Sequence, residues 1–343
     1  GGHVSEFEVI YSLNNGFKKV ALENPPKLKA GQVLLRPQYL TICGSDTHQM
    51  EMYQGDNLRL GHEWVALVEE VSKGVKNLKV GDRVTATAAI SCGDCSFCIE
   101  GKTNYCKKAT YLGSEEIGAL RSYLVMTEHN LVLVPKNIER AAVLFEVAAV
   151  GFEAVQLLKR QNNQSKDLTI FGCGSVGLMS ALAAKKEGYK ILLVDSVMAR
   201  VERAKRLGFK ACLDKELLLD PANKNSFSQI MDCTGDNAGG RGLWKMLPYY
   251  AAKGATAIMV GKYKGEISIM PDVLGRLGLK LVFMSGMGID SLKNAVSSFS
   301  DSIEELSHEF ITDTYNSDQV AEAFKKASVR EESLKVLIEI GAG

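Results

Sequence analysis

The stretch from Leu168 to Asp195 constrains the fold more than any other part of this 343-residue chain. The apolar run 168–171 is typical of a buried parallel strand, and it leads directly into Gly-Cys-Gly-Ser-Val-Gly at 172–177, where a helical pattern begins. A second apolar run, 191–194, ends in Asp195. A strand, a glycine-rich turn, a helix and an acid at the next strand end together predict a unit that binds a dinucleotide.

Each glycine of this turn has a predicted role. Gly172 permits the tight turn, Gly174 lets a pyrophosphate approach the backbone, and Gly177 lets the helix pack closely on its strand. The helix begins near Ser175 and Val176, so their N–H groups are expected to face the phosphates.

Asp195 is expected to accept hydrogen bonds from the adenosine ribose. A carboxylate at this position repels a 2′-phosphate, which predicts NAD rather than NADP. Arg200 lies on the following helix, where we expect it to touch the adenosine as part of a solvated face rather than clamp a phosphate.

The rest of the C-terminal half alternates apolar runs with helical patterns. Six strands separated by helices predict a doubly wound parallel sheet. Thr234 and Gly261 follow two of these strands, so they are expected to border the cofactor crevice. The expected strands are 168–171, 190–194, 211–213, 229–233, 255–260 and 280–285, with helices beginning near Val176, Val197, Gly239, Pro271 and Ser291.

The N-terminal third reads as β-rich, with expected strands such as 33–35, 65–68 and 80–84. It contains Cys43 and His62, two residue types that bind zinc, and a catalytic zinc takes three protein ligands and keeps one position open. Read alone, the cysteine also fits a small buried apolar residue, and the histidine fits a hydrogen-bonded core residue.

Four cysteines form a second candidate metal site. They are Cys92, Cys95, Cys98 and Cys106. This spacing fits a closed tetrahedral zinc site with a structural role. Two disulfides are the competing interpretation, which the spacing and the absence of a recognisable secretory signal disfavour. The other cysteines, Cys173, Cys212 and Cys233, are expected to be buried thiols without a role.

Composition excludes two classes of partner. A net charge of +1 gives no reason to expect nucleic acid or an anionic membrane surface. The most apolar run, 141–155, is interrupted by Glu146 and Glu153, so no membrane span is expected. These features predict a cytoplasmic protein.

The motifs together resemble the zinc-dependent medium-chain dehydrogenase/reductase family. Ile42-Cys-Gly-Ser-Asp-Thr-His48, Gly61-His-Glu63, the four-cysteine lobe and the glycine-rich turn occur here in that family's order. The resemblance implies an α/β protein with a GroES-like β-rich catalytic domain and a doubly wound parallel Rossmann domain. It places the catalytic domain at 1–150 and 291–343, because the chain returns to end in the strand Ser333–Ile340. The NAD-binding Rossmann domain is then 151–290.

The resemblance also implies the ligands of a catalytic zinc. Glu146-Val-Ala-Ala-Val-Gly151 is similar to the Glu-Pro-Leu-x-Val-Gly stretch of the sorbitol-dehydrogenase-like branch, although the proline and leucine are absent and Glu153 replaces the usual histidine. It implies zinc held by Cys43, His62 and Glu146, with Glu63 as a reserve ligand.

The implied reaction is reversible oxidation of a secondary alcohol or polyol, with hydride transfer to NAD. Ser45 is expected to accept the hydroxyl proton first and His48 to pass it to water, although an ordinary surface histidine is the alternative. Asp46 is expected to orient His62 and to be neutralised by Lys335. We expect each chain to bind two zinc ions and NAD. We also expect a homodimer or homotetramer that acts on a small molecule.

Two other functions remain open. One is a threonine- or sugar-phosphate-type zinc dehydrogenase. An Arg or Lys phosphate clamp in the pocket would distinguish it, and Arg59 and Arg121 are the candidates. The other is a catalytically retired relative that acts as a binding protein, because one fold can host different functions.

Overall fold

The computed structural model describes residues 5–235, 242–263 and 265–341. These residues form two compact units. The first contains the described residues up to Glu146 together with those from Met287 onward, and the second spans Val147–Gly286. The first unit is therefore discontinuous in sequence, because the chain returns to it after completing the second.

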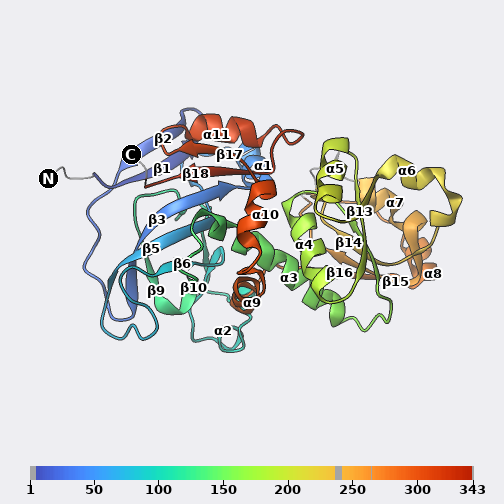
Figure 1. Cartoon of the computed structure of the whole chain (residues 1–343), viewed down its shortest axis with the longest axis horizontal. Helices are drawn as coiled ribbons and strands as arrows, with labels where there is room; N and C mark the ends of the chain where they lie inside the picture. Colours follow the sequence, from blue (N-terminus) through green and yellow to red (C-terminus); the bar gives the residue numbers. More distant parts are fainter. Residues whose placement is uncertain (1–4, 236–241, 264, 342–343) are drawn as a thin grey trace. The chain divides into compact units, whose positions relative to one another are not determined.

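The first unit is built mainly from β-strands (Figure 1). Its strands are β1 (Phe7–Ser12), β2 (Gly16–Ala21), β3 (Gln32–Ile42), β4 (Leu58–Arg59), β5 (Glu63–Val71), β6 (Arg83–Thr85), β7 (Ala89–Ile90), β8 (Thr110–Tyr111), β9 (Leu124–Thr127), β10 (Val132–Val134), β17 (Ile311–Asn316) and β18 (Lys335–Glu339). The main sheet has the order β10-β6-β5-β3-β18-β17, with β9 also paired to β3. A smaller sheet has the order β2-β1-β4, and β7 pairs with β8.

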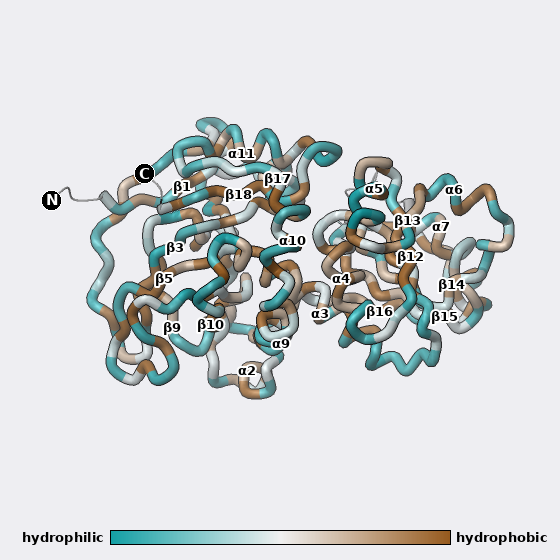
Figure 2. Tube along the Cα trace, viewed as in Figure 1, coloured by the Kyte–Doolittle hydropathy of each residue, from teal (hydrophilic) through white to brown (hydrophobic). Residues whose placement is uncertain are grey.

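The register of three neighbouring strands positions the candidate site. Thr41 of β3 pairs with Glu63 of β5, and Ile42 of β3 pairs with Val336 of β18. This register brings the end of β3 and the starts of β5 and β18 to one edge of the sheet. Figure 2 shows β5 and β18 as hydrophobic, and Trp64 of β5 is fully buried, so a packed core fixes this edge.

Five helices and three short 3₁₀ turns belong to the first unit as the structure describes it. They are α1 (Gly44–Met52), α2 (Ser96–Ile99), α9 (Ile289–Phe299), α10 (Ile303–Phe310) and α11 (Val320–Ala327), with short 3₁₀ turns η1 (Thr103–Tyr105), η2 (Glu128–Asn130) and η3 (Arg140–Leu144). Helix α11 packs on β18, and its buried Val320, Ala323, Phe324 and Ala327 follow the helical period.

One helical segment is long and apolar enough to cross a membrane. It runs from η3 into α3 (Phe145–Lys159) and covers Arg140–Lys159. However, 78% of its most apolar window is buried in the protein, as in the core helix of a globular domain.

The second unit contains one six-stranded parallel sheet of order β13-β12-β11-β14-β15-β16. Numbered within this unit, the order is 3-2-1-4-5-6, which is the doubly wound arrangement of a Rossmann fold. The predicted α/β fold is therefore confirmed. Its elements are β11 (Asp167–Phe171), β12 (Lys190–Asp195), β13 (Lys210–Leu213), β14 (Phe227–Asp232), β15 (Ala251–Met259), β16 (Lys280–Phe283), α4 (Ser175–Lys186), α5 (Met198–Arg206), α6 (Asp214–Leu219), η4 (Pro221–Asn223), α7 (Gly242–Tyr250) and α8 (Pro271–Leu277).

One strand of the first unit differs from its prediction. The strand expected at 80–84 begins only at Arg83, because Gly81 has a φ of +93° in a turn and Val80 is exposed. The helix start expected near Gly239 lies outside the described residues, and α7 begins at Gly242.

Candidate active site

His62 lies just before β5 and is held by Asp46 of α1. The Nδ1 atom of His62 lies 3.2 Å from Oδ1 of Asp46. The other Asp46 oxygen accepts the backbone N–H of Cys43 at 2.8 Å. Burial lowers the pKa of His62, but the carboxylates of Asp46, Glu146 and Glu63 together bring this pKa well above its ordinary value. Because Asp46 occupies Nδ1, Nε2 is the ring nitrogen left for a metal.

Glu63 pairs with Lys335 rather than standing free as a ligand. The Lys335 Nζ lies 2.6 Å from Oε1 and 2.9 Å from Oε2 of Glu63, and the Thr41 hydroxyl donates to Oε1 at 3.1 Å. The predicted neutralisation of Asp46 by Lys335 is therefore only a weak electrostatic effect, because the ion pair of Lys335 is with Glu63. Burial raises the pKa of Asp46, His62 brings it below its ordinary value, and Lys335 contributes the smallest of these effects.

Glu146 is the second residue of α3, and its carboxylate is buried among the same charges. Its pKa is raised to about 7, chiefly by burial and also by Glu63 and Asp46, while His62 and Lys335 act in the opposite direction. Among the described residues, neighbouring charges rather than hydrogen bonds act on the pKa of this carboxylate. A bound cation would stabilise its charged form, so Glu146 fits the role of a metal ligand.

The structure brings only some of the predicted site residues into direct contact. Candidate ligand atoms of Asp46, His62 and Glu63 lie within 4.8 Å of one another, and neither Cys43 nor Glu146 joins this group. Both still act on it electrostatically. Burial lowers the pKa of Lys335, and Cys43 is the largest of the effects that raise it. A thiol, an imidazole and a carboxylate in one buried region suit a catalytic zinc.

The predicted proton carriers both lie on α1. His48 is half-buried, whereas the side chain of Ser45 lies outside what the structure describes. Their proton-transfer roles therefore stay predictions.

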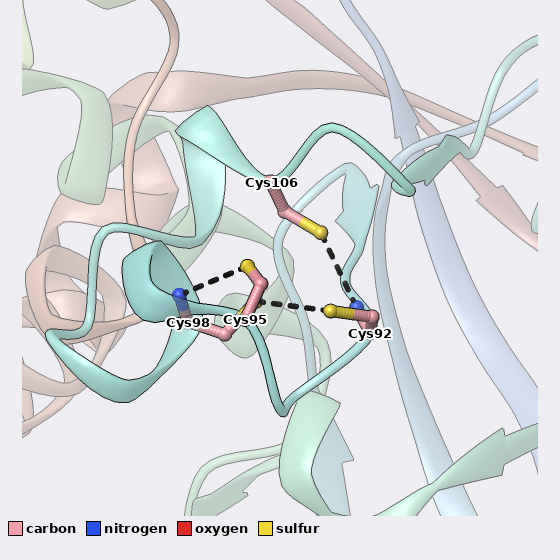
Figure 3. Close-up of side chains that lie close together, drawn as sticks. All are labelled: Cys92, Cys95, Cys98 and Cys106. Atoms are coloured by element: carbon pink, nitrogen blue, oxygen red, sulfur yellow. Dashed lines mark hydrogen bonds between the residues drawn. The ribbon is translucent and has the colours of Figure 1, made fainter.

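The four cysteines of the lobe turn toward one another (Figure 3). Their Sγ atoms lie within 4.8 Å of one another, with 3.9 Å between Cys92 and Cys98. Tetrahedral zinc with Zn–S bonds of about 2.3 Å separates its sulfurs by about 3.8 Å, so this spacing fits the metal. The Cys92 N–H donates to Cys106 Sγ at 3.4 Å, and this is the main cause that lowers the pKa of Cys106 to about 7. All four thiols are free, so the structure does not contain the alternative disulfides.

The glycine-rich turn has the geometry of a phosphate cradle. Gly172 has a φ of +105°, and a Cβ on Gly177 would lie 1.7 Å from the Gly172 carbonyl oxygen, so both positions require glycine. A Cβ on Gly174 would meet no atom within 4 Å, which leaves its backbone open to a ligand. Ser175 and Val176 form the first turn of α4, where free N–H groups favour an anion.

Asp195 ends β12 beside this turn. Its Oδ2 accepts the Cys173 N–H at 2.8 Å, and its Oδ1 accepts the Val197 N–H at 2.9 Å. Each carboxylate oxygen still has a lone pair that a ribose hydroxyl can use. Arg200 is half-buried on α5. Contact of Asp195 and Arg200 with adenosine stays a prediction.

Thr234 and Gly261 belong to a network that was not predicted. The Thr234 hydroxyl and N–H both donate to Asp232, which also accepts the hydroxyl of Tyr263. A Cβ on Gly261 would lie 2.5 Å from the backbone nitrogen of Gly235, so the two strand ends are in close contact. An aspartate two residues before a threonine is typical of an Asx turn, and this signal could have revealed the network.

Comparison with known proteins identifies the family. Residues 29–136 match a family model described as the alcohol dehydrogenase GroES-like domain. The chain is 30% identical over 345 residues to D-xylulose reductase A of Aspergillus oryzae, with 94% of each protein covered. The chain belongs to the zinc-dependent medium-chain dehydrogenase/reductase family. The predicted resemblance is thereby confirmed.

Two further proteins are similar to this medium-chain dehydrogenase over most of its length. It is 27% identical over 337 residues to sorbitol dehydrogenase of Bacillus subtilis, with 91% of each protein covered. The solved structure of an Escherichia coli oxidoreductase of unknown specificity has a TM-score of 0.86 at 26% identity, and the match covers 98% of this chain and 100% of that one. The protein is therefore an oxidoreductase of the zinc-type alcohol dehydrogenase group.

Proposed function

We propose that this medium-chain dehydrogenase reversibly oxidises a secondary alcohol or polyol with NAD as hydride acceptor. The observation that carries this proposal is the set of Cys43, His62 and Glu146, which act electrostatically on the buried Glu63–Lys335 ion pair. Similarity to D-xylulose reductase A and to sorbitol dehydrogenase supports a polyol substrate.

The residues of this set would hold a catalytic zinc. Zinc, when bound, supplies a Lewis acid that lowers the pKa of the substrate hydroxyl, and NAD, when bound, supplies the hydride acceptor. Asp46 orients His62 through Nδ1, and Lys335 neutralises Glu63. Glu63 is then a reserve ligand, because its carboxylate already has a cationic partner.

The proton released from the substrate hydroxyl needs a route to water. Ser45 and His48 lie in the first two turns of α1, directly after Cys43. We assign Ser45 as the first acceptor and His48 as the group that passes the proton to solvent.

The two compact units would have different roles. The unit that ends at Glu146 and resumes at Met287 is the proposed catalytic domain, and Val147–Gly286 is the proposed cofactor domain. The cysteine lobe would hold a second, structural zinc. Asp195 is the residue proposed to favour NAD over NADP, because a carboxylate beside the adenosine ribose would repel a 2′-phosphate. A homodimer or homotetramer is the proposed assembly.

A sugar-phosphate substrate is less well supported. The residues considered for a phosphate clamp are already used elsewhere, because Arg59 Nε lies 3.1 Å and Arg121 Nη1 3.8 Å from the Glu8 carboxylate. A retired, purely binding role is also less well supported, since every type of donor that a catalytic zinc needs is present.

A substrate panel tests the proposal. The zinc-loaded protein would be incubated with NAD and with polyols, amino alcohols or sugar phosphates, while NADH formation is followed by absorbance. We expect turnover with polyols. Turnover confined to sugar phosphates or amino alcohols would establish the alternative, and NADH binding without any turnover would favour the retired relative.

A further inference from the structure

The carboxylate of Asp232 joins the ends of two neighbouring strands in the second unit. Asp232 is the last residue of β14 and is fully buried. Its Oδ1 accepts the hydroxyl and the N–H of Thr234 at 2.5 and 2.9 Å, and its Oδ2 accepts the hydroxyl of Tyr263, which follows β15. Its backbone carbonyl accepts the N–H groups of Val260 and Gly261 at 3.0 and 2.8 Å. One residue therefore fixes both strand ends.

Among the described residues, hydrogen bonds from Thr234, Tyr263 and Gly235 stabilise the buried charge of Asp232. No lysine or arginine forms an ion pair with it in the part of the chain that the structure describes. Burial raises the pKa of Asp232, and the hydrogen bonds from Thr234 and Tyr263 act in the opposite direction. A buried carboxylate without a cation is a costly way to join two loops, which suggests that its effect on those two hydroxyls matters.

These strand ends adjoin the glycine-rich turn. A Cβ on Gly172 would lie 2.7 Å from the Cys233 carbonyl oxygen and 3.1 Å from the Thr234 nitrogen. In the sheet, β12 with Asp195 lies on one side of β11, and β14 lies on the other. A dinucleotide in a doubly wound sheet spans this switch point. With adenosine on the β12 side, the nicotinamide riboside half lies over the ends of β14 and β15.

The network decides what kind of group these hydroxyls can bind. Thr234 Oγ1 and Tyr263 Oη lie 3.0 Å apart, and the hydrogen atom of each is directed at Asp232. Both oxygens therefore offer a ligand only lone pairs, so they accept hydrogen bonds and do not donate them. The nicotinamide riboside half offers matching donors, namely the ribose hydroxyls and the carboxamide NH₂.

We propose that Asp232 is a positioning residue for the dinucleotide, which holds the Thr234 and Tyr263 hydroxyls as a paired acceptor for a donor group of the nicotinamide riboside half. This inference rests on the proposed use of NAD. The Trp244 ring packs edge-on against the Tyr263 ring with 5.9 Å between centroids, so the ring has a support that does not depend on its hydroxyl.

Calorimetric titration of the zinc-loaded full chain tests this inference with three ligands. ADP occupies only the adenosine half, ADP-ribose adds the second ribose, and NADH adds nicotinamide. Tyr263→Phe should weaken NADH binding by about tenfold, the effect of one hydrogen bond in a charged network, and leave ADP binding unchanged. If the donor is a ribose hydroxyl, ADP-ribose binding should weaken as NADH binding does. If the donor is the carboxamide, ADP-ribose binding should stay unchanged, as ADP binding does. Tyr249→Phe removes a tyrosine hydroxyl elsewhere in the unit and should change none of the three.

Thr234 provides the conservative comparison. Thr234→Ser keeps the hydroxyl and should bind NADH nearly as the wild type does. Thr234→Val removes the hydroxyl and should weaken NADH binding as Tyr263→Phe does. Equal weakening of ADP and NADH in Tyr263→Phe would show a merely structural role, and unchanged NADH binding would exclude the paired acceptor; either result overturns the inference. A wild-type chain that binds neither ADP nor NADH would instead overturn the proposed function and this inference together.

Discussion

The Nζ of Lys335 lies 2.6 Å from a carboxylate oxygen of Glu63, and both side chains are almost completely buried. The two residues are 272 positions apart in the chain, yet they meet because β18 and β5 both pair with β3. Loss of one partner would leave the other charge buried and uncompensated, which is the costly way to break such a pair.

Replacement of Lys335 by methionine should therefore destabilise the protein strongly. The expected loss is about 3–5 kcal/mol, or a thermal midpoint lower by about 10 °C, because Glu63 loses its counter-charge. Lys326→Met is the matched control. Lys326 pairs with Glu332 at 2.9 Å at the surface, so its replacement should change the midpoint little. Equal midpoints for the two variants, measured by calorimetry, would contradict a structural role for the buried pair.

The two zinc sites should be separable by metal analysis. The wild type should contain two zinc ions per chain. Cys98→Ser should contain one and melt at a lower temperature, because the lobe loses its cross-link. Cys43→Ala should also contain one zinc but keep its melting temperature and lose turnover. Cys212→Ser, at a half-buried thiol in the other unit, should retain both ions. One zinc in the wild type would remove one of the proposed sites.

Glu146 is the proposed carboxylate ligand of the catalytic zinc. Glu146→Ala should lower activity or catalytic zinc affinity by at least the ~10–100-fold that even indirect changes at metal sites cause. Glu153→Ala removes a half-buried glutamate from the same helix and serves as the control. Glu63→Ala should be less harmful to metal binding, because Glu63 already pairs with Lys335. Full zinc and turnover in Glu146→Ala, with loss of both in Glu63→Ala, would transfer the ligand role to Glu63.

Cofactor choice should depend on Asp195. The wild type should have a higher kcat/KM with NAD than with NADP. Asp195→Ala should weaken NAD binding and reduce the preference for NAD over NADP, because it removes both the ribose acceptor and the negative charge. Some of the loss will come from the turn itself, since Asp195 also holds the Cys173 and Val197 N–H groups. Asp167→Ala, at the exposed start of β11, is the control. A wild-type preference for NADP would contradict this assignment.

Local patterns explain how much of the fold could be predicted. The glycine-rich turn and the apolar runs after Leu168 predicted the Rossmann sheet correctly, because each strand and turn leaves its signal in neighbouring residues. The spacing of the four cysteines likewise predicted their convergence. Val80 was assigned to a strand because it is apolar, although the turn at Gly81 exposes it.

Contacts between distant segments could not be predicted in the same way. The partner of Lys335 depends on the register of β18 against β3, and no local pattern specifies a pairing between strands so far apart in sequence. The hydrogen bond between Tyr263 and Asp232 depends in the same way on the order of the parallel strands. The chemical types of the site residues and the contact of Asp46 with His62 were therefore predictable, but the partners of Lys335 and Tyr263 were not.

NADH formation by the zinc-loaded wild type with a panel of polyols tests whether this protein is a zinc-dependent polyol dehydrogenase. The measurement would be repeated after removal of metal with a chelator and again after zinc is restored. We predict turnover with at least one polyol, its loss when the more exchangeable of two zinc ions is removed, and its recovery with zinc. Polyol turnover that persists without zinc, or a fully zinc-loaded protein that oxidises none of the polyols, would contradict the account.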